Sequence, residues 1–167
     1  MINNINPTIL NFGIINIRWY GLFLAIGVAL SIWILTKLAK KNNLSVNTIL
    51  DLCVWLVIGG LIGARLGYAL FYQAGYYLAH PLEIIFINHG GLSSHGLTLG
   101  LIISFLLFCK IKKISFRDYI DILIIPIPLL AGFIRLGNFF NSEIVGRATD
   151  LPWGVYFPRF EESPILR

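Results

Sequence analysis

The chain has 167 residues, of which 57% are hydrophobic and only 13% are charged, and its mean hydropathy is +0.79. A soluble domain carries about 25% charged residues, so this composition excludes an ordinary soluble enzyme and indicates an integral membrane protein. The formal net charge of +5 does not indicate a nucleic-acid-binding protein, because the basic residues are scattered between apolar runs and suit membrane topology signals better.

The first half of the chain contains two predicted membrane spans. Residues 1–18 have neither the basic segment nor the small-residue cleavage site of a secretory signal. Within them Ile9–Ile17 is apolar but too short to cross a bilayer, so we expect it in the membrane interface. The spans are predicted at residues 19–38, with lysines at the far end, and 49–72. In the second, small residues that allow close helix packing recur every four positions: Gly59, Gly63 and Gly67.

Two further spans are predicted in the second half. The third covers residues 92–109, and Lys110, Lys112, Lys113 and Arg117 follow it at once. The fourth covers residues 119–140 and contains Pro126 and Pro128, which predict a kink or an irregular turn. Residues 141–167 form a polar, proline-bearing segment that cannot span. Cys53 and Cys109 have no disulfide or metal-ligand spacing, so we expect unpaired, buried thiols.

The distribution of basic residues predicts the orientation. The loops after the first and third spans carry most lysines and arginines, whereas residues 73–91 carry none. The positive-inside rule therefore places the first two loops in the cytoplasm. The N-terminus, residues 73–91 and residues 141–167 then face outward. The predicted fold class is all-α: a polytopic integral membrane helical bundle of about four transmembrane helices with an outward-facing polar segment, in a single membrane domain over residues 1–167.

This topology gathers polar side chains from all four spans toward the outer leaflet. They are Tyr20, Arg65, His95 and Arg135, one from each predicted helix. An arginine inside an apolar helix costs about 2.5–3.5 kcal/mol to insert, so it normally has a partner or a function. On a helix, Asn138 and Ser142 would share one face with Arg135. Such a group of charges, amides and nearby glycines is suited to holding a lipid phosphate at the membrane surface.

Each of these residues also has a purely structural interpretation. Arg135 would serve as a structural charge if it paired with Glu143 or reached the interface from the helix end. Arg65, on one face with two tyrosines, is as suited to helix packing as to phosphate binding. Tyr20 beside a tryptophan suits an aromatic anchor at the interface. His95 is equally suited to satisfying a buried hydrogen bond, and His80 and His89 are expected on the surface of the outer loop.

The order of residues from Arg135 to Gly146, Arg-x-Gly-Asn-x-x-Asn-x-Glu-x-x-Gly, closely resembles the signature of the prolipoprotein diacylglyceryl transferase family, which are bacterial membrane enzymes. Four other segments match that family in the same order: Arg18–Gly21, Gly63–Tyr68, Gly90–Gly96 and Thr149–Val155. The resemblance therefore runs through most of the chain.

The resemblance implies transfer of a diacylglyceryl group from phosphatidylglycerol to the lipobox cysteine thiol of a prolipoprotein signal peptide. This is the first step of lipoprotein maturation, at the outer (periplasmic) face of the bacterial inner membrane. It implies His95 as the base for the thiol, Arg135 as a bidentate clamp on the phosphate, and no metal or cofactor. The remaining implied site residues, for catalysis or substrate binding, are Tyr20, Arg65, Asn138, Asn141, Glu143 and Gly146.

Two departures from the family leave alternatives open. Leu97 follows Gly96 where a second glycine is common, and family members carry further helices and polar residues beyond the equivalent of Arg167. A truncated, catalytically inactive remnant is therefore one alternative. A small membrane transport subunit is another, because such proteins also hold intramembrane arginines and proline-kinked helices. The concentration of polar residues on the outer side argues against a transport pathway.

Overall fold

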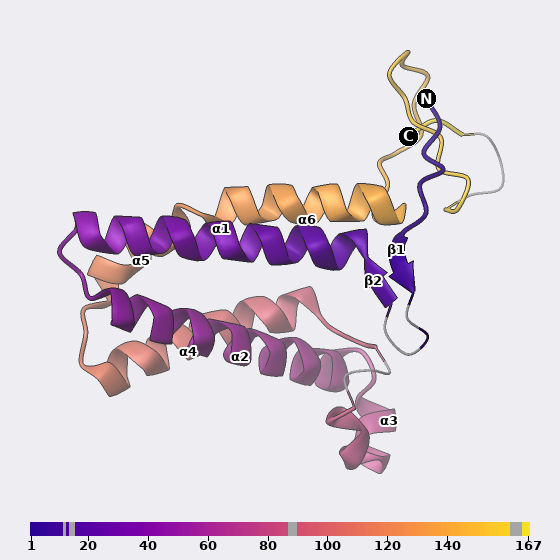
Figure 1. Cartoon of the computed structure of the whole chain (residues 1–167). Coiled ribbons are helices and arrows are strands. Elements are labelled where there is room, and N and C mark those ends of the chain that lie inside the picture. Colours follow the sequence, from indigo (N-terminus) through magenta and orange to yellow (C-terminus); the bar gives the residue numbers. More distant parts are fainter. Residues whose placement is uncertain (12, 14–15, 87–89, 161–164) are drawn as a thin grey trace. The chain divides into compact units, whose positions relative to one another are not determined.

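The computed structural model describes residues 1–11, 13, 16–86, 90–160 and 165–167 and is mainly helical (Figure 1). Helix α1 spans Trp19–Lys41, α2 spans Val46–Phe71 and α4 spans Ser94–Lys112. Helices α5, Phe116–Ile124, and α6, Ile127–Asn141, follow one another along the fourth apolar stretch. Within the described ranges, four helical stretches are long and apolar enough to cross a bilayer. The chain is thus a multi-pass, all-α membrane protein, as predicted.

The chain divides into two compact units. Unit 1 comprises Met1–Leu35 and Leu123–Arg167, and unit 2 comprises Thr36–Ile122. The boundaries lie inside α1 and α5, so each unit is described by itself.

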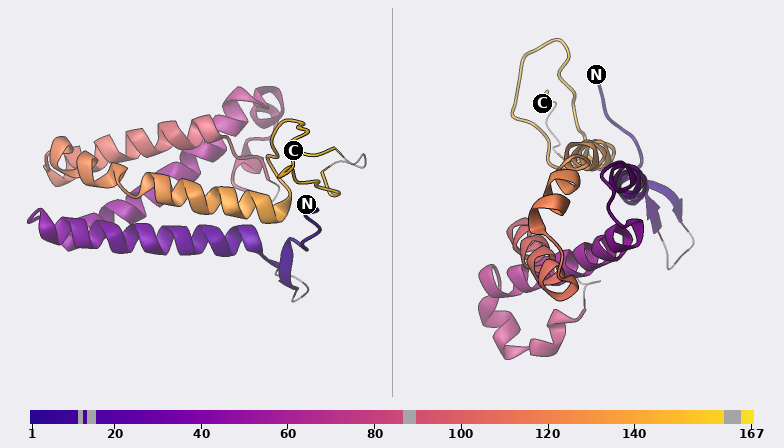
Figure 2. Two further views of the ribbon diagram at one scale, coloured as in Figure 1. Left: turned by 90° about the horizontal axis from the view of Figure 1, so that it is seen from above. Right: turned by 90° about the vertical axis from the view of Figure 1, so that its left-hand side faces the viewer.

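In unit 1, α6 packs beside the first part of α1, as the views in Figure 2 show. Two glycines permit the close approach. A Cβ atom at Gly27 would lie 2.9 Å from the Cβ of Phe133, and one at Gly137 would lie 3.1 Å from the Cα of Tyr20. Near Tyr20, the rings of Trp19 and Phe140 approach to 5.2 Å between centroids. The two helices are therefore held together by glycine contacts and stacked aromatic rings.

The segment before α1 contains a small antiparallel strand pair. Strand β1, Thr8–Asn11, pairs with β2, Asn16–Arg18, and Leu10 lies opposite Ile17. The apolar stretch predicted in the interface thus contributes to two strands. A short apolar run suits a strand as well as a helix, which composition alone does not resolve.

The two ends of the chain meet beside the end of α6. The backbone N–H of Asn3 donates to the carbonyl of Tyr156 at 2.8 Å, and the Asn3 amide donates to the carbonyl of Phe139 at 2.6 Å. Tyr156 forms a bridge with Ile2 on one side and with Leu166 on the other. The segment after α6 contains no helix in its described part, in agreement with the prediction that it does not span.

In unit 2, α2 crosses α4 at the small residues found in the sequence. A Cβ atom at Gly63 would lie 2.6 Å from the Cα of Gly100, and one at Gly67 would lie 2.5 Å from the Cα of Gly96. Real Cβ atoms do not approach so closely, so only glycine permits this contact. The predicted small-residue packing is confirmed, and its partner is the start of the third span.

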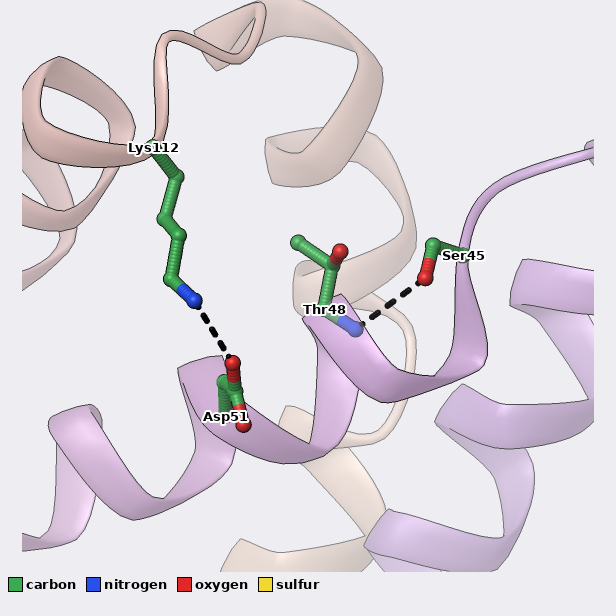
Figure 3. Close-up of polar contacts among 4 residues, drawn as sticks. All are labelled: Ser45, Thr48, Asp51 and Lys112. Atoms are coloured by element: carbon green, nitrogen blue, oxygen red, sulfur yellow. Dashed lines mark hydrogen bonds and ion pairs between the residues drawn. The ribbon is translucent and has the colours of Figure 1, made fainter.

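Polar contacts define the opposite end of the same helix pair (Figure 3). The Ser45 side chain accepts a hydrogen bond from the backbone N–H of Thr48 at 3.3 Å and caps α2. The Lys112 ammonium lies 2.8 Å from the Asp51 carboxylate and joins α4 to α2. Both side chains are about half exposed, so this ion pair contributes at most about 1 kcal/mol. Cys53 and Cys109 are free thiols, as predicted; Cys109 is buried, as expected, whereas Cys53 is only half-buried.

The fourth span is interrupted where the sequence predicted a kink. Helix α5 ends at Ile124 and α6 begins at Ile127, with Pro126 at the N-cap. Proline lacks an N–H donor and clashes with the preceding turn, so it is tolerated at a helix start and not in its interior. The predicted irregularity is therefore confirmed as a break between two helices.

Candidate functional site

Arg135 and Asn138 lie one turn apart on α6 in unit 1 but differ in exposure. Asn138 is 5% exposed, whereas Arg135 is exposed. Arg135 forms no hydrogen bond or ion pair with any residue that the structure describes, and so none with Glu143. The interpretation of Arg135 as the structural partner of Glu143 is therefore not supported. Tyr20 contacts α6 at Gly137, between these two residues, which brings Tyr20 beside the same turn.

Helix α6 ends in a tight turn that contains several of the candidate residues. The backbone N–H of Glu143 donates to the carbonyl of Asn138 at 2.9 Å, and that of Ser142 donates to Phe139 at 3.2 Å. This is the Schellman arrangement, and it requires the left-handed φ of +56° at Ser142. Ser142 thus leaves the helix. The prediction that Ser142 shares a helix face with Arg135 and Asn138 is therefore wrong.

The turn presents hydrogen-bonding groups that are not fully used. The Asn141 amide donates to the Glu143 carboxylate at 3.2 Å. Asn141 Oδ1 and Ser142 Oγ are buried and have no hydrogen-bond partner among the described residues. A buried polar atom without a partner costs about 1–3 kcal/mol, so such atoms often mark a place where a ligand or water binds. Gly146, further along, is exposed, and its carbonyl accepts from Arg167 at 3.3 Å.

Arg65 lies on α2 in unit 2 and is 3% exposed. Its guanidinium is surrounded by backbone carbonyls of the segment between α2 and α4, which contains helix α3, Ala74–Ala79, and the 3₁₀ helix η1, Pro81–Ile84. Nε donates to Ile84 at 2.8 Å, Nη1 to Gly91 at 3.1 Å and to Gly90, and Nη2 to Glu83 at 2.7 Å and Phe86 at 3.0 Å. A guanidinium has five N–H donors, so all are in use and none remains for a phosphate.

An aromatic cluster surrounds the end of α2 near Arg65. The guanidinium carbon of Arg65 lies 5.1 Å from the ring centroid of Tyr77. The rings of Tyr68 and Tyr72 stack at 5.9 Å with an angle of 11° between their planes. Of the loop histidines, His80 is exposed, as expected, and His89 lies outside the described residues.

His95 is the second residue of α4 and is exposed. Its Nδ1 lies 3.2 Å from the hydroxyl oxygen of Tyr72, and its Nε2 has no partner among the described residues. The interpretation as a buried hydrogen-bonding histidine is therefore not supported. The sequence did not identify Tyr72 as a partner, although its place on one face with Arg65 and Tyr68 was a signal for it.

An apolar groove of about 680 Å³ follows the crossing of α2 and α4. The glycines of the crossing form part of its lining, together with large aliphatic and aromatic side chains such as Ile58, Leu66 and Phe71. Its lining includes Gly96 and Phe71, which are the sequence neighbours of His95 and Tyr72. A surface of this kind suits apolar chains.

The structure thus brings the candidate residues together in two groups, one in each unit. Tyr20, Arg135, Asn138, Asn141 and Glu143 lie along or beside the end of α6, and His95 and Arg65 lie at the α2–α4 crossing. Among the described residues, no three His, Cys, Asp or Glu side chains are placed to hold a metal ion.

Comparison with known proteins matches the chain to one family. The family model for prolipoprotein diacylglyceryl transferase matches residues 7–167. The chain belongs to this family.

Several curated members of the prolipoprotein diacylglyceryl transferase family are similar to the chain. The phosphatidylglycerol–prolipoprotein diacylglyceryl transferases of Desulfotalea psychrophila and Bordetella avium are each 43% identical to it, over 162 and 158 residues. That of Chloroherpeton thalassium is 40% identical over 162 residues. These matches cover 92%, 92% and 96% of this chain and 57%, 60% and 60% of the relatives. The chain therefore spans less than two thirds of the length of the curated relatives that it matches.

Proposed function

We propose that this protein transfers the diacylglyceryl group of phosphatidylglycerol to the lipobox cysteine thiol of a prolipoprotein. The sulfur forms a bond with the terminal glyceryl carbon of the lipid, and the bond from that carbon to the phosphate oxygen breaks. The thiol proton passes to a base, and glycerol phosphate leaves with the bonding electron pair. Family membership supports the reaction, and the environment of Arg135 supports the site.

The observation that carries the proposal is that Arg135 forms no ion pair with the described residues although it lies in an apolar helix. A charge in this place needs a partner, and the lipid phosphate supplies one. The guanidinium binds two phosphate oxygens at once and stabilises the negative charge that grows as the carbon–oxygen bond breaks. Lysine carries the same charge but lacks this two-pronged geometry.

The turn after Arg135 is proposed to bind the glycerol of the head group. Hydroxyl groups of glycerol donate hydrogen bonds, and Asn141 Oδ1 and Ser142 Oγ are buried acceptors without a described partner. Asn138 and Glu143 lie in the same turn and add an amide and a carboxylate. Tyr20 lies against Gly137 at the start of this turn, and a Cβ atom at Gly146 would meet only the carbonyl carbon of Arg167, at 4.0 Å.

His95 is proposed as the base that takes the thiol proton. A free thiol has a pKa of about 8.5, so little thiolate exists at neutral pH without a base. The imidazole is exposed, and its Nε2 has no described partner. Arg65 is assigned to loop packing instead of phosphate binding, because carbonyls occupy all of its donors.

The proposed location is the bacterial inner membrane, with the site on the periplasmic face. The distribution of lysine and arginine between the loops supports this orientation. It places the end of α6 and the start of α4 at the face where a secreted prolipoprotein emerges.

The test is a lipidation assay on purified protein in phosphatidylglycerol bilayers with a labelled lipobox peptide. One lost charge-assisted contact corresponds to roughly 3 kcal/mol, so Arg135→Lys is expected to lower the rate about a hundredfold. Arg117→Lys, the same change at an exposed arginine at the start of α5, is the matched control. A folded Arg135→Lys protein within a few-fold of wild type would refute the phosphate clamp. If the folded wild-type protein shows no transfer, the proposed activity is refuted and the alternative of a catalytically inactive remnant is favoured.

A further inference from the structure

The hydrogen bond between Tyr72 and His95 joins the end of one helix to the start of another. Tyr72 is the C-cap residue of α2, and His95 is the second residue of α4. The close contact of Gly67 with Gly96 brings these helix ends together, so the Tyr72 hydroxyl oxygen reaches His95 Nδ1 at 3.2 Å. The stacked ring of Tyr68 holds the Tyr72 ring in a fixed plane.

The direction of this hydrogen bond decides whether His95 can act as a base. A neutral imidazole carries one proton, either on Nδ1 or on Nε2. If Tyr72 donated to Nδ1, the proton would lie on Nε2, and the nitrogen that has no described partner would have no lone pair to accept another. If Nδ1–H donates to the Tyr72 oxygen, Nε2 keeps its lone pair and is able to take the thiol proton.

We infer that Tyr72 is a positioning residue that accepts a hydrogen bond from His95 Nδ1–H and thereby keeps Nε2 unprotonated as the base. This inference rests on the proposed role of His95. Tyr72 is 56% exposed, so its own hydroxyl proton is free to bond to water while its oxygen accepts from His95. Tyr72 touches neither the thiol nor the lipid in this role; it acts through the imidazole.

The protonated nitrogen is observable by ¹⁵N NMR, because the two ring nitrogens differ in chemical shift when one carries hydrogen. The chain has three histidines, so in a His80→Gln, His89→Gln background all imidazole signals come from His95. At a pH where the imidazole is neutral, we expect the proton on Nδ1. Tyr72→Phe should move it toward Nε2, and Tyr68→Phe, which keeps both rings, should not. A proton on Nε2 in the background protein would overturn the inference, as would an unchanged tautomer in Tyr72→Phe.

Transfer kinetics supply the second measurement. A general base contributes about 10²–10⁴-fold to a rate, and a wrong tautomer forfeits part of this, so kcat of Tyr72→Phe should fall by roughly tenfold or more with KM little changed. A shifted tautomer with an unaltered kcat would overturn the positioning role, and so would a lower kcat with an unaltered tautomer. The NMR experiment does not depend on turnover. Absence of transfer in the background protein would therefore count against the proposed function, while the tautomer of His95 would still decide the direction of the hydrogen bond.

Discussion

Replacing Arg65 by lysine would retain the positive charge at the centre of the loop between α2 and α4 but reduce the number of N–H donors. The guanidinium donates to five backbone carbonyls, whereas an ammonium has three donors. At least two carbonyls would lose their donor. A hydrogen bond to a charged group contributes about 1.5–3 kcal/mol, so two correspond to about 3–6 kcal/mol. Some carbonyls belong to exposed residues such as Phe86 and can bind water instead. We therefore expect the loop to lose local stability near the lower end of this range, about 3 kcal/mol.

Hydrogen exchange measures this loss where it occurs. The backbone N–H groups of Glu83, Ile85 and Phe86 are hydrogen-bonded within the loop, to the carbonyls of His80, Leu82 and Glu83. A local loss of about 3 kcal/mol should raise the exchange rates of these three N–H groups more than a hundredfold in Arg65→Lys. Exchange in the middle of α2 should change little, and the control Arg117→Lys should leave the exchange rates of the three loop N–H groups unchanged. Exchange within about threefold of wild type at all three N–H groups would show that the carbonyls around Arg65 do not hold the loop.

Two further predictions concern the helix packing and the orientation. Gly63→Ala should lower the melting temperature, because its Cβ would lie 2.6 Å from the Cα of Gly100 and overpacking costs about 1–3 kcal/mol. The control Gly132→Ala, whose Cβ would meet no described atom within 4 Å, should be neutral or stabilising. Equal changes in melting temperature for the two variants would contradict the packing argument. In a Cys53→Ala, Cys109→Ala background, Leu78→Cys should react with an impermeant maleimide in intact cells and Ser115→Cys only after lysis. The reverse labelling pattern would refute the proposed orientation.

Much of the helical architecture could be predicted from the sequence, because membrane spans are defined by long apolar runs that composition shows directly. The four stretches, the break near Pro126 and the glycine contacts of α2 all follow from local residue properties. The strand pair before α1 and the short helices α3 and η1 could not be predicted. Their few residues lie below the length at which hydrophobic periodicity separates a strand from a helix.

The candidate site was predictable in residue type but not in pairing. The polar residues at the end of α6 stand out because charges and amides are rare in an apolar chain. The environment of Arg65 does not stand out in the sequence, because its acceptors are backbone carbonyls, which any residue supplies. The turn at Ser142 was also missed, since a left-handed φ at a helix end usually coincides with glycine. The bond from Tyr72 to His95 depends on how two helices cross, which no local pattern encodes.

The carbonyl shell of Arg65 also bears on how the protein enters the membrane. Every acceptor of the guanidinium lies 18 to 26 residues further along the chain than Arg65 itself. During synthesis, α2 therefore leaves the ribosome before the residues that satisfy its arginine do. At that stage the arginine opposes insertion by about 2.5–3.5 kcal/mol, and in the proposed orientation this opposition disappears once the following segment has crossed the membrane and folded around it. In this orientation, stable insertion of α2 is coupled to the translocation of the loop that comes after it.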